Sequence, residues 1–210
     1  MTKKCLIIYT SLSGNTEMVA SRFKSTFEKN RWQCDMFKID KKAYILNPPF
    51  DFNNYDFVCV GSGIRMHLPY DDILWLMRRQ FFGLIPIVLK HASEGEASKL
   101  EGIKPIVQST ASIPHRKIEF TNSKNAVAFA TYAGFDFGPK EAEPSLQLLA
   151  LEIEHLGFKC IGQFCCPGKY SDKVRLGTYH GDIRDRPNEK DLLKAEMFIE
   201  EKLEQIENRI

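Results

Sequence analysis

The amino-acid sequence predicts an α/β fold, a three-layer sandwich in which helices cover both faces of a five-stranded parallel sheet of order 2-1-3-4-5. First, short apolar runs alternate with segments of helical periodicity, as in a doubly wound sheet. Second, the first apolar run ends in a loop rich in hydroxyl groups, and this order is the simplest that places the loop at the switch point. Third, 210 residues, 43% of them hydrophobic, can bury a sizeable single core.

Continuous apolar runs, bounded by polar or glycine-containing segments, mark the predicted strands. Such runs are typical of parallel strands that are buried on both faces. The strands expected on this basis are Cys5 to Tyr9, Cys34 to Ile39, Phe57 to Gly61, Ala126 to Thr131 and Lys159 to Phe164.

Helices are expected between and after these strands, where apolar residues recur at helical spacing and start or stop signals flank them. They run from Thr16 to about Lys29, from Asp71 or Asp72 toward Phe82, from Glu141 to Leu156, and from Glu189 onward. Gly157 is a stop signal for the third helix, and Pro187-Asn188 a start signal for the last. The last helix has the clearest apolar stripe, formed by Leu192, Ala195, Ile199, Leu203 and Ile206, which we expect to pack on the core.

Residues 83–123 are too many for a plain connection between a helix and the next strand. We therefore predict a single domain over residues 1–210 with an insertion at 83–123. Because the insertion starts at the C-terminal end of a helix, it should emerge at the edge of the sheet away from the first loop.

Charge and composition exclude several classes of function. Lys and Arg number 29 against 27 Asp and Glu, a net charge of +2 that is too balanced for a nucleic-acid-binding surface. There is no secretory leader and no apolar stretch of membrane-spanning length, so we expect a cytoplasmic protein without a membrane partner. The six cysteines lie mostly in apolar runs, as buried thiols do in a reducing compartment, and no Cys-x-x-Cys spacing indicates a metal.

The segment from Tyr9 to Glu17 is the most informative, because a strand runs into a polar loop that opens a helix. The loop contains four polar donors and one glycine: Ser11, Ser13, Asn15, Thr16 and Gly14. At a helix N-terminus the first amides lack partners and the dipole favours negative charge, so this loop is suited to a phosphate. No lysine or arginine lies between Tyr9 and Val19, so oriented dipoles would hold the anion. The alternative is an ordinary turn in which Asn15 or Thr16 caps the helix.

Two further loops should lie beside the first. In an open α/β sheet, ligands bind outside the carboxyl ends of the strands at the switch point. In the predicted order the loops at that place are residues 10–16, 62–68 and 131–137.

These residues resemble the flavodoxin family. Tyr9 to Glu17 is similar to that family's FMN phosphate loop, Gly61-Ser62-Gly63-Ile64 to its second flavin loop, and Thr131-Tyr132-Ala133-Gly134-Phe135 to its third. Cys166-Pro167-Gly168-Lys169 and the segment from Arg186 to Leu192 resemble a branch of stand-alone or ferredoxin-fused flavodoxin-like proteins of bacteria and archaea. The resemblance covers nearly the whole chain except residues 83–123.

The resemblance implies noncovalently bound FMN and electron transfer, with no catalytic residue and no metal. The phosphate would be bound by side chains of Ser11, Ser13, Asn15 and Thr16 and by the amides of Leu12 and Gly14, while the other two loops bracket the flavin ring. The cofactor-binding residues expected on this basis are Thr10, Ser11, Leu12, Ser13, Gly14, Asn15, Thr16, Ser62, Gly63, Ile64, Arg65, Thr131, Tyr132, Ala133, Gly134 and Phe135.

The sequence departs from the family pattern in three ways. Arg65 and Met66 stand where this branch often has a stacking aromatic, which leaves Tyr132, His67 or Tyr70 to cover the ring. A sequence pI near 8.1 lacks the acidity of typical electron-carrying flavodoxins, so we expect a less negative flavin potential and a different partner. The cysteine cluster of a fused ferredoxin domain is missing, so electrons must come from a separate redox partner protein or from a nicotinamide.

Three functions follow from these observations. The leading one is an FMN-binding redox protein that shuttles electrons between partners. The second is an FMN-dependent NAD(P)H oxidoreductase acting on a quinone or similar acceptor, and the third a flavin-free interaction module on the same scaffold. The sequence leaves open whether the chain forms a homo-oligomer.

Several cysteine, histidine and arginine residues have both a functional and a structural explanation. Cys59 and Arg65 have the Cys-x5-Arg spacing of tyrosine phosphatases, but Cys59 lies in an apolar strand where a thiolate is disfavoured. Cys165 and Cys166 could form a redox pair, although adjacent cysteines bridge only with strain and buried thiols are favoured. His180 could be a proton donor at the flavin edge or a structural histidine. Arg65 could stabilise negative charge on reduced flavin or be solvated.

Overall fold

A computed structural model describes residues 2–40, 44, 45, 47–82, 124–134, 137–169 and 180–208 of the chain. The predicted insertion at residues 83–123 lies outside the described residues, as does Phe135.

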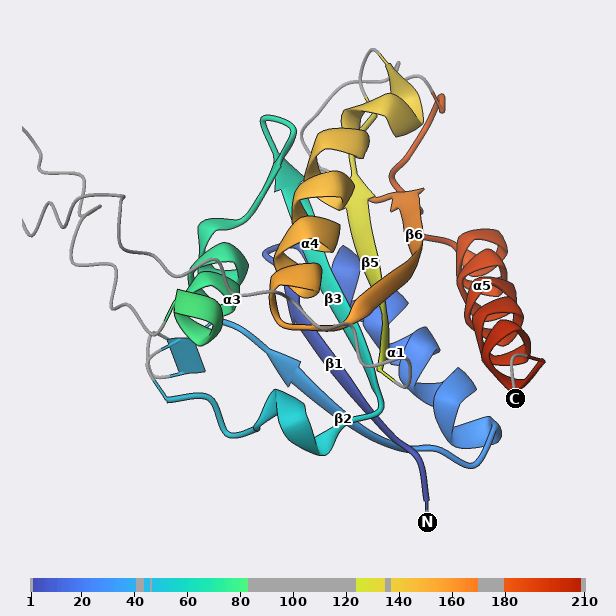
Figure 1. Cartoon of the computed structure of the whole chain (residues 1–210). Coiled ribbons are helices and arrows are strands. Elements are labelled where there is room, and N and C mark those ends of the chain that lie inside the picture. The colour runs from blue at the N-terminus through green and yellow to red at the C-terminus, as the bar shows by residue number, and fades with distance from the viewer. Residues whose placement is uncertain are drawn as a thin grey trace, which may run out of the picture.

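The predicted parallel sheet is present, and its order is confirmed (Figure 1). Its parallel strands are β1 (Lys4–Thr10), β2 (Gln33–Lys38), β3 (Phe57–Arg65), β5 (Asn125–Tyr132) and β6 (Lys159–Pro167). They are arranged in the order β2-β1-β3-β5-β6, which is the expected 2-1-3-4-5. A further strand that the sequence did not predict, β4 (Leu68–Pro69), pairs with β3 in antiparallel fashion.

Helices cover both faces of this sheet, and in Figure 1 α4 lies in front of the strands and α1 behind them. The described elements are α1 (Asn15–Lys29), α3 (Asp71–Phe82), α4 (Glu143–His155), α5 (Glu189–Glu207) and the short helices η1 (Phe52–Asn54) and η4 (Gly138–Glu141). Each predicted helix is present within a few residues of its expected bounds. Glu141 belongs to η4 rather than to the helix expected from Glu141, because α4 begins at Glu143.

The core divides into two apolar layers, one on each face, because successive residues of a strand point to opposite sides of the sheet. In β1, Leu6 and Ile8 pack toward α3 and α4, whereas Ile7 and Tyr9 pack toward α1 and α5. The layer under α1 is aromatic, with the rings of Phe23 and Phe129 centred 5.0 Å apart. This two-sided burial explains why the strands read as continuous apolar runs.

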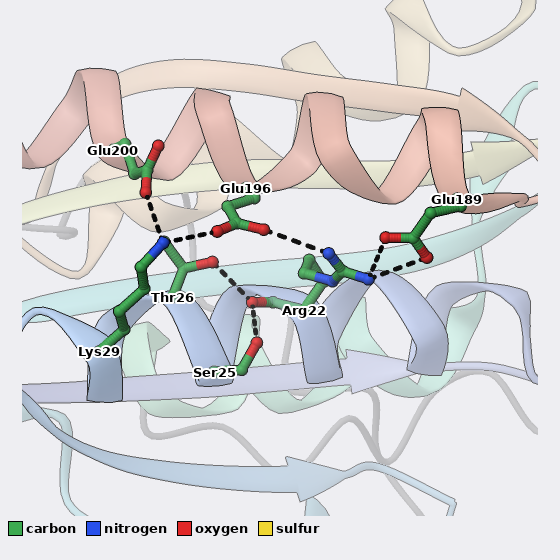
Figure 2. Close-up of polar contacts among 7 residues, drawn as sticks. All are labelled: Arg22, Ser25, Thr26, Lys29, Glu189, Glu196 and Glu200. Atoms are coloured by element: carbon green, nitrogen blue, oxygen red, sulfur yellow. Dashed lines mark hydrogen bonds and ion pairs between the residues drawn. The ribbon is translucent and has the colours of Figure 1, made fainter.

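A network of ion pairs joins α1 to α5 above the second layer (Figure 2). Glu196 of α5 accepts from Arg22 at 3.1 Å and from Lys29 at 3.0 Å, both on α1. Arg22 also pairs with Glu189, and Lys29 with Glu200. These charged side chains lie along the two helices where α5 faces α1 (Figure 2).

The strand register brings the predicted loops to one edge of the sheet. Thr10 at the end of β1 is paired with Ser62 of β3, and Gly63 of β3 with Thr131 of β5. Because the three strands are parallel, their carboxyl ends and the loops that follow lie side by side at the switch point.

Candidate functional site

A cavity of about 590 Å³ opens at this edge of the sheet, within the volume range of small-molecule sites. It is lined by Leu12, Ser13, Asn15, Gly63, Ile64, Arg65, Met66, His67, Tyr70, Thr131, Tyr132, Ala133, Phe137, Glu141, Gly168 and Lys169. Three of its apolar side chains are largely exposed, Leu12 at 81%, Met66 at 85% and Phe137 at 64%, and they give the cavity an apolar rim.

Helix α1 begins at this cavity without a side-chain cap. Its N-cap residue is Gly14, whose φ of 85° lies in the left-handed region that favours glycine. Neither Asn15 nor Thr16 caps the helix, so the part of the alternative interpretation that made one of them the N-cap is wrong. The first amides of α1 are left available to an anion.

The hydroxyl of Ser11 is buried without a partner. The residue is only 6% exposed, and within the described part of the chain its Oγ has no hydrogen-bond partner. An unpaired buried hydroxyl costs about 1 to 3 kcal/mol, so native proteins rarely keep one without a reason. Ser11 directly precedes the cavity-lining residues Leu12 and Ser13, where a bound anion would supply the missing acceptor.

Other polar residues of the first loop are hydrogen-bonded to distant parts of the chain. The Nδ2 of Asn15 donates to the carbonyl oxygen of Lys169 at 2.7 Å, and the hydroxyls of Thr16 and Thr131 are 2.8 Å apart. Thr16 is 1% exposed and does not line the cavity. These two side chains therefore tie the first loop to β5 and to the end of β6, a role that the local motif did not predict.

Ser62 has no hydrogen-bonding capacity left for a ligand. Its hydroxyl donates to the carbonyl oxygen of Gly63 at 2.7 Å and accepts from the backbone amide of Tyr70 at 2.9 Å. Its oxygen is also 2.9 Å from the hydroxyl of Thr10, which must then be the donor. Thr10 and Ser62 thus hold the ends of β1 and β3 together beneath the cavity.

The second loop is a tight hairpin between β3 and β4. Met66 and His67 form a two-residue turn, and both have positive φ, 51° and 65°, as type I′ turns require. Such φ values are strained for a bulky residue such as Met66. The buried hydroxyl of Ser145 on α4 donates to the carbonyl oxygen of His67 at 2.8 Å and pins the turn in place.

The third loop presents Tyr132 to the cavity. Its hydroxyl is 2.9 Å from Nε2 of His180, which comes from the segment before α5. Burial raises the pKa of Tyr132 above its usual range, so the phenol stays protonated. Burial also lowers the pKa of His180, assisted by the positive charge of Arg186. His180 is not among the cavity-lining residues of the described chain, so it reaches the site only through Tyr132.

The predicted site residues are brought together, although not all of them face the cavity. Those that line it are Leu12, Ser13, Asn15, Gly63, Ile64, Arg65, Thr131, Tyr132 and Ala133. The other described residues of the prediction are not among those that line it: Thr10, Ser11, Gly14, Thr16, Ser62 and Gly134.

The site prediction missed two cavity-lining residues that follow β6, Gly168 and Lys169, which are far in the sequence from the three predicted loops. Gly168 packs directly on Asn15, since a Cβ at Gly168 would lie 2.5 Å from Nδ2 of Asn15. Lys169 adds a basic side chain to a cavity that already contains the exposed Arg65. The first loop contains no cationic residue, but the described lining of the cavity as a whole contains two. The sheet order, which puts β6 beside β5, was the signal that could have indicated them.

The buried cysteines are not suited to nucleophilic chemistry. Cys59 is fully buried in β3, and burial raises its pKa, which argues against a phosphatase site with Arg65. All six cysteines are free thiols. Burial raises the pKa of Cys165 to about 11 and that of Cys166 further, so both are protonated at neutral pH.

Within the part of the chain that the structure describes, no helix is both long and apolar enough to span a membrane.

Comparisons with known proteins identify the fold. No protein-family model matches the chain. An uncharacterised protein of Methanocaldococcus jannaschii is 28% identical over 196 residues, which are 93% of this chain and 95% of that protein. A flavodoxin from the domain Archaea superposes with a TM-score of 0.54 at 13% identity, over 97% of this chain and 99% of its own. Oxidised flavodoxin 2 from Bacillus cereus gives a TM-score of 0.55 at 13% identity, over 93% and 94%. The chain therefore has the flavodoxin-like fold.

Proposed function

We propose that this protein binds FMN noncovalently in the cavity and acts as an electron-transfer flavoprotein. The observation that carries the proposal is the buried, unpartnered hydroxyl of Ser11 beside the uncapped N-terminus of α1. A phosphate accepts hydrogen bonds from both, and it replaces an unpaired hydroxyl and free amides with charge-assisted bonds.

The cavity also suits the remainder of the cofactor. Its volume of about 590 Å³ accommodates a tricyclic ring, and Tyr70 and Tyr132 supply aromatic walls. Arg65 lies at the lining, where a cation stabilises negative charge on the reduced ring. When bound, FMN supplies the one- and two-electron chemistry, and the protein supplies binding, orientation and electrostatics.

The apolar rim supports contact with a redox partner protein. Leu12, Met66 and Phe137 surround the cavity and remain exposed, so a partner that covers them also covers the route to the ring. Exposed apolar patches of this kind are typical of interaction sites.

A second candidate is an FMN-dependent NAD(P)H oxidoreductase acting on a quinone or similar acceptor. The observation that favours it is the pair of basic residues, Arg65 and Lys169, at the cavity. Nicotinamide nucleotides are anionic, and a basic cavity attracts them.

The absorbance spectrum of the purified protein, before and after incubation with FMN, tests the proposal. We expect a flavin spectrum that stays with the protein through gel filtration. Protein that is colourless and takes up no FMN would instead support a flavin-free interaction module. Stopped-flow mixing with NAD(P)H then separates the two redox functions, because rapid bleaching without a partner protein is expected only of the oxidoreductase.

A further inference from the structure

We infer that His180 is a positioning residue: its imidazole fixes the phenol ring of Tyr132 as a wall of the cavity and thereby sets the affinity for the flat ring of the ligand. The inference rests on the proposed function, and it concerns the ring end of the site rather than the phosphate end.

The contact between the two residues is direct and long-range. The hydroxyl of Tyr132 is 2.9 Å from Nε2 of His180, 48 positions further along the chain, and the two rings are 5.7 Å apart at their centroids. Tyr132 is 4% exposed and lines the cavity, whereas His180 is not among the lining residues of the described chain. A buried tyrosine hydroxyl requires a partner, and this partner determines the orientation of the ring.

The protonation states show which forms of the two groups meet. The pKa of Tyr132 is raised by burial and that of His180 is lowered by burial, so at neutral pH a protonated phenol meets a neutral imidazole, and the tautomer of the imidazole decides which of them donates. Arg186 and Lys194 further lower the pKa of His180, while Asp191 and Glu141 act in the opposite direction. A side chain at position 180 must therefore offer a hydrogen-bonding group to hold Tyr132.

The backbone around the pair leaves little room for other arrangements. Gly134, with a φ of 68°, lies against both rings. A Cβ there would be 2.9 Å from Cε2 of Tyr132 and 3.1 Å from Cδ2 of His180. Gly134 thus packs against both members of the hydrogen-bonded pair, where a larger residue would push them apart.

The segment that follows His180 is anchored at two points, so the imidazole is held in place. Arg186 forms an ion pair with the buried carboxylate of Asp191 at the start of α5. The carbonyl oxygen of Arg186 accepts from the backbone amide of Lys169 at 2.8 Å, which ties the segment to the end of β6. The contact between His180 and Tyr132 therefore links α5 and β6 to the cavity wall.

The test compares His180→Leu, which removes the hydrogen-bonding group, with His180→Gln, whose amide can donate or accept. Dissociation constants for both FMN and riboflavin are measured by fluorescence quenching. We expect His180→Leu to weaken both ligands by roughly fivefold to tenfold, the effect of one lost hydrogen bond, and His180→Gln to restore most of the affinity. Tyr132→Phe should give a similar loss, and adding His180→Leu to it should weaken binding little further, because the two residues act through one bond.

The pattern across the two ligands separates this inference from the proposed function. Equal losses for FMN and riboflavin place the effect at the ring, whereas unchanged affinities in His180→Leu, or a failure of His180→Gln to rescue, would overturn the positioning role. If the wild-type protein binds neither flavin, the proposed function fails. NMR signals of the Tyr132 ring in the ligand-free protein then still decide: His180→Leu should shift and broaden them and His180→Gln should not, and signals unchanged in both variants overturn the inference.

Discussion

At the scale of one residue, Ser11 shows how a group suited to ligand binding can lower the stability of the ligand-free protein. Its buried hydroxyl has no partner in the described structure, so the free protein gains nothing from it. A bound phosphate changes this, because the hydroxyl then makes a hydrogen bond to a charged group.

For Ser11→Ala we predict opposite changes in stability and affinity. The free energy of unfolding of the ligand-free protein should stay the same or rise by up to about 1 kcal/mol, because an unpaired buried hydroxyl is removed. FMN binding should weaken by about 1.5 to 3 kcal/mol, while riboflavin binding should not change. Urea unfolding and calorimetric titration measure the two quantities. A variant that is clearly less stable and binds FMN normally would show that Ser11 is an ordinary structural residue.

Met66 and His67, which line the cavity, have a strained backbone conformation. Both adopt positive φ, and Asn-Gly is the dipeptide that this turn prefers. We predict that Met66→Asn combined with His67→Gly raises the free energy of unfolding by about 1 kcal/mol. The urea midpoint should rise with an unchanged m-value. Because Met66 also lines the cavity, the flavin affinity of this variant should fall, and a lower midpoint would contradict the strain.

Arg65 is the residue at which electrostatic tuning of the flavin can be measured. It is exposed and lines the cavity. Arg65→Glu should lower the midpoint potential of bound flavin, because a negative charge disfavours the reduced, anionic ring. Arg65→Lys keeps the charge and serves as the control, with a potential close to the wild-type value. A potentiometric titration in which all three proteins agree would remove Arg65 from this role.

At the scale of elements, the docking of α5 on α1 depends on a network of charges centred on Glu196 (Figure 2). Hydrogen bonds from Lys29 and Arg22 lower the pKa of Glu196. The side chain of Glu196 is 19% exposed, whereas that of Glu189, which pairs with Arg22, is 76% exposed. The more shielded carboxylate with two partners should contribute more.

For Glu196→Gln we predict a loss of about 0.5 to 1 kcal/mol in the free energy of unfolding at neutral pH and low salt. Glu189→Gln, the control, should lose only a few tenths. The folded-state pKa of Glu196 lies below its unfolded value, so its contribution is full above the usual range of glutamate and is lost as the pH falls through the folded-state pKa. The difference between wild type and Glu196→Gln should therefore shrink in acid and in high salt. A difference that is independent of both would indicate a packing effect.

The elements were predictable to different degrees, for physical reasons. The strands of the parallel sheet were found because burial on both faces produces continuous apolar runs, as in Ile7-Ile8 of β1. Strand β4 was missed because it has only two residues, Leu68 and Pro69, and its hairpin turn lacks the glycine or asparagine that signals such turns. The predicted helix bounds are off by at most two residues, most of all at the start of α4, where the short helix η4 takes the preceding turn.

At the scale of the whole molecule, the sheet order predicted the edge at which the candidate cavity lies. It did not predict which polar residues face that cavity and which form hydrogen bonds within the fold. A local motif shows which polar groups a loop contains, and not which of them the fold uses for itself. Thr16 is hydrogen-bonded to Thr131, 115 positions further along the chain. Asn15 is hydrogen-bonded to the backbone of Lys169, 154 positions further along. Only the folded chain reveals that Ser11 has no partner among the described residues and that Lys169 lines the cavity.

The difference in affinity between FMN and riboflavin for the wild-type protein tests the central claim most directly. Both ligands present the same ring, and only FMN carries the phosphate that we assign to Ser11 and the first amides of α1. By isothermal titration calorimetry in one buffer, we predict that FMN binds at a single site at least roughly 100-fold more tightly, because two charge-assisted hydrogen bonds contribute about 3 kcal/mol even at the lower end of their range. Equal affinities for the two ligands, or no binding of FMN, would contradict it.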